Sequence, residues 1–180
     1  MKKVRSHFIV LVLWILTIVI LETISINPKD ATSELPPKPP PYEYLIPLIS
    51  DQQPKLDPIF AQTIAKFIHQ YATEFKIPAE LIISIIMVES SFIPTSTSSA
   101  NCVGLMQINP RAHPTKIEGF EIHQLYYIDT NIKIGCRILK EYYEATGSIN
   151  ETLTKYLGKA DQGYNNRILS SFADLMISKK

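Results

Sequence analysis

Between Ala79 and about Ser91 the chain is almost entirely apolar, which leaves few folds open to it. Pro78 precedes this stretch, and proline is well tolerated where a helix begins. The aliphatic side chains are Leu81, Ile82, Ile83, Ile85, Ile86, Met87 and Val88. A helix without a polar face has to be covered on all sides by other elements. We therefore predict a central, buried helix over 79–91.

Amphipathic segments on both sides can provide that cover. Asp57 and Pro58 are residue types typical of an N-cap and a first helical position. The apolar positions that follow at helical spacing are Phe60, Ile64, Phe67, Ile68, Tyr71 and Phe75. A second pattern begins after Asp129-Thr130 and ends at Gly147, a typical C-terminal cap. Its members are Ile132, Cys136, Leu139, Tyr142 and Tyr143, and shorter helices are predicted over 151–157 and 162–177.

A long loop region, 93–128, separates the central helix from the next one. It is rich in Ser, Thr, Pro and Gly, with one short apolar piece from Val103 to Ile108. Loops of this length in a compact domain usually have a function. No run of alternating strand residues occurs, so the predicted class is all-α, mainly helical, with room for one short hairpin.

The first segment, 1–26, has the features of an export signal. Lys2, Lys3 and Arg5 precede an apolar run, 8–21, that contains no charge. No small-x-small cleavage site follows, so we favour an uncleaved signal anchor over a cleaved signal peptide. The chain is then exported and anchored in the inner membrane, facing the periplasm or cell wall. A cleaved, secreted form is the alternative.

Residues 27–56 are predicted to be a proline-rich linker. Nine prolines lie between Asn27 and Pro58, and the stretch shows no helical period. Such segments stay extended and semi-rigid. The linker would hold a single domain, 57–180, away from the membrane.

The charge balance gives no sign of a nucleic-acid partner. The chain has 18 basic and 17 acidic residues, a net charge of +1. The four histidines do not have the spacing of metal ligands; they are His7, His69, His113 and His123. No glycine-rich phosphate loop is present either. We therefore expect no metal and no cofactor. Binding specificity has to come from a local site rather than from the overall charge of the chain.

Glu89 stands at the end of the apolar helix. Burial and the negative end of the helix dipole both disfavour its charged form, so both raise its pKa. A carboxyl group that stays protonated near neutral pH can protonate a glycosidic leaving oxygen. The alternative is a glutamate that reaches solvent or pairs with a lysine, and for a glutamate taken in isolation this is the commoner case.

Four sequence elements around and after Glu89 resemble the signature of the lysozyme-like lytic transglycosylases. The family elements are written E-S-x-F-x-P with a following S, G-L-M-Q, N-I-x-x-G and A-A-Y-N-x-G. The matching residues are Glu89-Ser90-Ser91-Phe92-Ile93-Pro94 with Ser98, Gly104-Leu105-Met106-Gln107, Asn131-Ile132 with Gly135, and Thr154-Lys155-Tyr156-Leu157-Gly158. The likeness covers about Ile77 to Leu169 in the family order.

The resemblance implies a small, mainly helical lysozyme-like domain with a substrate groove. It also implies cleavage of the β-1,4 bond between N-acetylmuramic acid and N-acetylglucosamine in peptidoglycan, with formation of a 1,6-anhydro ring. Glu89 would act first as the acid and then as the base. Ordinary glycosidases need two carboxyl groups, and the next acidic residue is the distant Glu118. A distant acid such as Asp129 or Asp161 keeps hydrolysis open.

Matching residue by residue assigns further roles. Ser98 resembles a serine that hydrogen-bonds near Glu89, while Met106 and Gln107 resemble groove residues that hold the sugar. Tyr156 matches a tyrosine whose hydroxyl is expected near the carboxyl group. Each has a structural alternative: a turn serine, a methionine that fills the core, or a tyrosine that only packs.

Cys102 and Cys136 lie in two of these elements. Taken alone, the cysteines are either a disulfide or two buried thiols. The resemblance favours a disulfide between them, because the two elements pack near one another in the family. Leu157 departs from the family pattern, which usually has asparagine there.

Two competing functions stay open beside the transglycosylase. One is a true lysozyme that uses water. The other is a catalytically silent peptidoglycan-binding component of a secretion or conjugation machine, which the departure at Leu157 leaves open. The partners expected are peptidoglycan strands, the membrane through 1–26, and such a machine.

Overall fold

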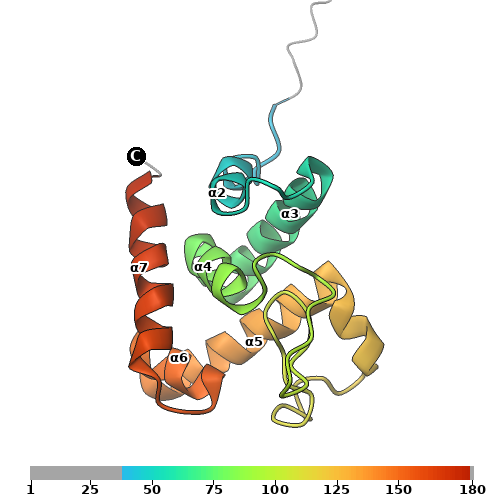
Figure 1. The fold of residues 1–180 in the computed structure, drawn as a ribbon, viewed down its shortest axis with the longest axis vertical. Helices are drawn as coiled ribbons and strands as arrows, with labels where there is room; N and C mark the ends of the chain where they lie inside the picture. The colour runs from blue at the N-terminus through green and yellow to red at the C-terminus, as the bar shows by residue number, and fades with distance from the viewer. Residues whose placement is uncertain (1–37, 179–180) are drawn as a thin grey trace, which may run out of the picture. The chain divides into compact units, whose positions relative to one another are not determined.

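The computed structural model describes residues 38–178, and Figure 1 shows their arrangement. The elements are α2 (Leu45–Gln52), α3 (Pro58–Phe75), α4 (Ala79–Ser90), the 3-10 helix η1 (Ile122–Tyr126), α5 (Ile128–Thr146), α6 (Ile149–Leu157) and α7 (Gln162–Ser178). Within these residues the only β-type pairing consists of two isolated bridges, from Val103 to Thr97 and to Ile108. The mainly helical class predicted from the sequence is confirmed, and the short hairpin is reduced to these bridges.

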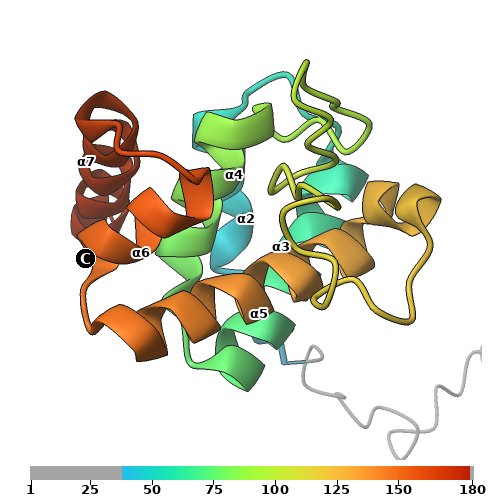
Figure 2. The same cartoon turned by 90° about the horizontal axis from the view of Figure 1, so that it is seen from below.

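Helix α4 is the centre of the domain. It packs against α7, α3 and α2, and Figures 1 and 2 show it between α7 on one side and α3 on the other. Every residue from Ala79 to Ile86 is buried. Because other elements cover all sides of the helix, its apolar side chains are shielded from water and it does not need a polar face. The predicted central helix is confirmed.

The predicted ends of α3 and α5 are also confirmed. The Asp57 side chain accepts a hydrogen bond of 2.8 Å from the Ile59 N–H, and Pro58 occupies the first turn. Gly147 ends α5 with φ +67, in the left-handed region that favours glycine. These two helices lie against each other and form the layer on which the long loop region rests.

Helix α2 corrects the predicted linker. Residues 45–52 form a helix whose Leu45 and Ile49 are fully buried, and it packs on α3 and α4. The compact unit begins at Pro39, so the extended spacer predicted for 27–56 does not reach residue 56. Pro47 misled the sequence interpretation, because it lies in the first turn of α2, where a missing N–H does no harm.

The predicted membrane anchor, 1–26, and residues 27–37 of the predicted linker lie outside the described residues. Among residues 38–178, no helix has both the length and the apolar character needed to cross a bilayer.

Candidate active site

Glu89 lies in the last turn of α4, where the chain reverses. The reversal is made by Ser91 and Phe92, whose φ angles are +51 and +63. The Phe92 side chain is almost fully buried and ties this corner to the core. Glu89 is partly buried, so one side of its carboxyl group faces protein and the other faces a cleft.

Two opposing effects act on the pKa of Glu89. Burial is the larger effect and raises the pKa above its usual value. A hydrogen bond from Tyr164 and the nearby positive charge of Arg167 act in the opposite direction. The net result is a raised pKa, as the position of Glu89 in the sequence predicted.

Tyr164 is the partner of the Glu89 carboxyl group. It lies in the first turn of α7, is 4% exposed, and its hydroxyl donates a hydrogen bond to Oε1 of Glu89. Burial and the charge of Glu89 both raise the pKa of Tyr164, so the phenol keeps its proton. Glu89 therefore has a permanent donor beside it.

Asn131 fixes the loop that faces Glu89. Its Oδ1 accepts from the Met106 N–H at 2.7 Å, and its Nδ2 donates to the carbonyl oxygens of Val103 at 2.9 Å and Leu125 at 2.7 Å. Gly104 makes this contact possible: a Cβ atom there would lie 2.2 Å from Nδ2 of Asn131, and its φ is +79. The glycine of the G-L-M-Q element and the asparagine of the N-I-x-x-G element thus depend on each other.

Gly135 and Met106 form a second close contact between these elements. A Cβ atom on Gly135 would lie 2.3 Å from the Met106 sulfur. Met106 has no exposed surface and does not line the cleft. The structure therefore corrects the prediction that its side chain lies on the groove wall: it fills the core above α5, and only its main chain takes part in the site.

Tyr156, predicted to lie near the Glu89 carboxyl group, is hydrogen-bonded to the main chain of the facing loop. Its hydroxyl donates to the carbonyl oxygen of Met106 at 2.7 Å, while the hydroxyl bonded to Glu89 comes from Tyr164. Tyr156 lines the same cleft as Glu89. Burial raises the pKa of Tyr156 most, and the charge of Glu89 raises it further. It braces the loop that carries Gln107.

Gln107 and Ser98 are held in the loop by its backbone. The Gln107 amide donates to the carbonyl oxygens of Gly104 at 2.9 Å and Ser96 at 3.2 Å. The Ser98 hydroxyl oxygen accepts from the Cys102 N–H at 3.1 Å. Both side chains line the cleft, so their remaining hydrogen-bonding groups can meet a ligand.

These side chains surround a cleft of about 610 Å³, within the range of ligand pockets. The cleft contains four of the five residues predicted to form the site, with Met106 missing. The lining residues are Glu89, Ser98, Ala100, Cys102, Gln107, Ile108, Asn109, Ala112, His113, Tyr142, Lys155, Tyr156, Leu157, Gly158 and Lys159. Glu89 is the one carboxylate among them. The arrangement offers one proton donor and acceptor beside a row of polar groups.

The predicted disulfide is absent, and both cysteines are free thiols. Cys136 is fully buried on α5, and burial raises its pKa well above the usual value. Cys102 is half-buried on the cleft wall, where its N–H is bonded to Ser98. The two sequence elements do pack together, but through Met106 and Gly135 rather than through sulfur atoms.

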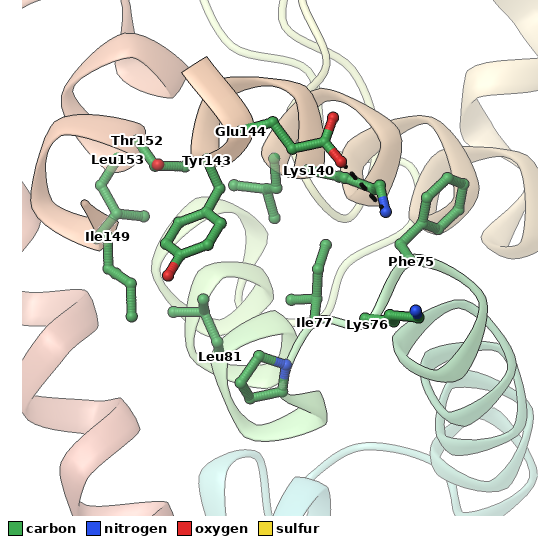
Figure 3. A pocket seen from close by; sticks show the side chains of 12 residues that line it. Phe75, Lys76, Ile77, Leu81, Lys140, Tyr143, Glu144, Ile149, Thr152 and Leu153 are labelled. Atoms are coloured by element: carbon green, nitrogen blue, oxygen red, sulfur yellow. Dashed lines mark ion pairs between the residues drawn. The ribbon is translucent and has the colours of Figure 1, made fainter. Parts of the chain in front are cut away.

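A second pocket, of about 370 Å³, lies between the first turn of α4, the end of α3, α5 and α6 (Figure 3). Its walls are mostly apolar, and Lys140 and Glu144 form an ion pair of 3.4 Å beside it. Leu81 lines this pocket, whereas Glu89 lies at the opposite end of α4. Glu144, paired with Lys140, is the one acid among the described residues that line this pocket, so the pocket does not offer the chemistry of the Glu89 cleft.

No group of three or more His, Cys, Asp or Glu side chains within residues 38–178 is placed to hold a metal ion.

Tyr164 is the functional residue that the sequence interpretation missed. A signal was present: Tyr164 and Asn165 form a Tyr-Asn pair eight positions after Tyr156. Asn165 fastens α7 to α6 through hydrogen bonds to Oδ1 of Asn150 at 2.8 Å and Oγ1 of Thr154 at 2.9 Å.

Comparison with known proteins decides the family. Residues 66–168, more than half of the chain, match the family described as the Transglycosylase SLT domain. The chain belongs to the transglycosylase SLT family. It is also similar to "Membrane-bound lytic murein transglycosylase E" of Buchnera aphidicola subsp. Acyrthosiphon pisum (strain APS), with 41% identity over 71 residues. The matched region covers 36% of this chain and 32% of that relative, about a third of its length.

Proposed function

We propose that this SLT-family chain is a lytic transglycosylase that cuts the glycan strands of peptidoglycan. It would break the β-1,4 bond between N-acetylmuramic acid and N-acetylglucosamine and leave a 1,6-anhydro ring. The proposal rests on the observation that, among residues 38–178, Glu89 is the one carboxylate that lines the cleft. A hydrolase of the usual kind needs a second carboxyl group near the scissile bond.

In the first step the protonated Glu89 carboxyl group gives its proton to the glycosidic oxygen. The bond from C1 of the muramic acid to that oxygen breaks, and N-acetylglucosamine leaves with a free 4-hydroxyl. The raised pKa of Glu89 supports this step, because it keeps the acid protonated at higher pH than an exposed glutamate.

In the second step the 6-hydroxyl of the same muramic acid attacks C1. Its proton goes to the Glu89 carboxylate, which is thereby restored as an acid, and no water is consumed. Tyr164 supports the interval between the steps, because its hydroxyl is bonded to Oε1 while the carboxylate is charged. Arg167 adds a favourable positive charge.

The cleft wall would hold the sugar. The Gln107 amide already donates to two main-chain carbonyl groups, which leaves its Oε1 as an acceptor for a sugar hydroxyl. The Ser98 hydroxyl accepts one bond from the loop and keeps its own proton to donate. Tyr156 fixes this wall through the Met106 carbonyl group.

The location and partners are proposed on the sequence. We propose that 1–26 anchors the chain to the inner membrane and that the domain faces the peptidoglycan. The name of the Buchnera relative describes that protein as membrane-bound, which agrees with such an anchor. We also propose, from the sequence, that the chain works beside a secretion or conjugation machine.

The test is a digest of purified peptidoglycan by the full chain in detergent, beside Glu89→Gln, with the released muropeptides identified by mass. Anhydro ends from the wild type and none from Glu89→Gln are expected. Hydrated reducing ends would instead support a lysozyme. Binding without release from the folded wild type would support the silent component.

A further inference from the structure

Two lysines of the cleft have no part in the proposed reaction. Lys155 lies in the last turn of α6, and Lys159 follows its capping residue Gly158. Both line the Glu89 cleft and both are exposed. Within residues 38–178 the ion pairs join other side chains, so neither lysine has a carboxylate partner. Two free ammonium groups therefore border the cleft.

The surroundings of Lys155 keep its charge beside the cleft. Its Nζ lies 5.9 Å from the centre of the Tyr142 ring, which also lines the cleft. Glu141, whose charge raises the pKa of Tyr142, is paired with Lys116. Apart from Glu89, none of the described residues that line the cleft is acidic, so the charges of Lys155 and Lys159 are not cancelled by a second carboxylate on the cleft wall.

The lysines are also separate from the environment of the acid. A hydrogen bond from Tyr164 and the charge of Arg167 lower the pKa of Glu89 against the larger effect of burial, and the two lysines are not among the causes of its shift. Their charges are therefore available to act on what the cleft binds.

We propose that Lys155 and Lys159 bind a carboxylate carried by the glycan strand, and so favour acidic strands over neutral glycans. The inference rests on the proposed function and specifies its substrate. Two groups on peptidoglycan share this chemistry: the carboxylates of the peptide stem, and the lactyl carboxylate that is free once the stem has been removed. A competing explanation is that both lysines only stabilise the negative C-terminal end of α6.

The experiment measures binding by the full-length Glu89→Gln chain, which does not cut its ligand. Three β-1,4 glycans are compared at low salt: peptide-bearing strands, strands stripped of their peptides, and neutral chitooligosaccharides of matched length. Lys155→Gln/Lys159→Gln is added to this background. The matched control, Lys38→Gln/Lys55→Gln, removes the same charge from exposed positions outside the cleft.

We expect Lys155→Gln/Lys159→Gln to weaken binding of carboxylate-bearing strands by roughly two- to ten-fold, with no change for chitooligosaccharides. A loss on peptide-bearing strands alone assigns the site to the stem, a loss on stripped strands alone assigns it to the lactyl group, and a loss on both shows that the site accepts either carboxylate. Added salt should remove the difference. Equal losses on all three glycans, no loss at all, or an equal loss in the control would overturn the proposal.

Failure of the proposed function would look different. If the wild-type chain released no fragments while the lysine variants still lost selective binding, the carboxylate site would stand and catalysis would fall. If fragments were released but the lysine variants bound as well as their parent, the proposed reaction would stand and the carboxylate site would fall.

Discussion

Replacing Tyr164 with phenylalanine separates the hydrogen bond at Glu89 from the packing around it. Phenylalanine keeps the buried ring and removes the hydroxyl that donates to Oε1. The hydrogen bond favours the charged carboxylate, so its removal raises the pKa of Glu89 further. Because the free enzyme needs Glu89 protonated, the fall of kcat/KM at alkaline pH should move to higher pH.

The size of this movement follows from the hydrogen bond. A bond to a charged group contributes about 1.5 to 3 kcal/mol, and one to a neutral group about 0.5 to 1.5 kcal/mol. The difference is about 1 to 1.5 kcal/mol, or roughly one pH unit. The variant should also be slower at its optimum, because the carboxylate formed in the first step loses its donor.

The assay is the pH dependence of kcat/KM for release of soluble muropeptides by the wild type, Tyr164→Phe and Tyr143→Phe. Tyr143 is exposed and does not line the cleft, so its variant should follow the wild type. An alkaline limb that stays in place in Tyr164→Phe, or moves to lower pH, would refute the account of Tyr164.

Other perturbations test the loop and the cysteines. Asn131→Ala removes three buried hydrogen bonds and should lower the free energy of unfolding by about 3 kcal/mol or more, measured with denaturant; a loss below about 1 kcal/mol would contradict the bracing role. Gly135→Ala should cost about 1 to 3 kcal/mol because the new methyl group meets Met106, and adding Met106→Val should recover part of the loss; strictly additive costs would argue against the contact. A thiol-alkylating reagent should label Cys102 in the native protein and Cys136 only after unfolding, as read by mass; a chain that carries no free thiol after unfolding without reductant would instead restore the disulfide.

Much of the fold follows from local signals in the sequence. The apolar run that forms α4, the Asp57-Pro58 start of α3 and the Gly147 end of α5 each depend on neighbouring residues alone. Helix α2 was not predicted, because its buried face is made by α3 and α4, and the prolines in and around it gave the stronger local signal. The position of Pro47 in a first turn is visible only once the helix is known.

The site could be predicted only in part, because some of its contacts join residues that are far apart in the sequence. The position of Glu89 on an apolar helix indicates burial, but its donor comes from Tyr164, which is 75 residues away. Spacing along the chain cannot say which of two tyrosines on neighbouring helices reaches the acid. The buried side chain of Met106 likewise depends on the absence of a Cβ atom at Gly135.

The central claim is that Glu89 serves both steps and that no water enters the product. It is tested most directly by digesting peptidoglycan with the full chain in water enriched in oxygen-18 and weighing the released muropeptides. The account predicts anhydro products without the heavy oxygen. Reducing ends that carry oxygen-18 would show that water attacked C1, and would contradict it.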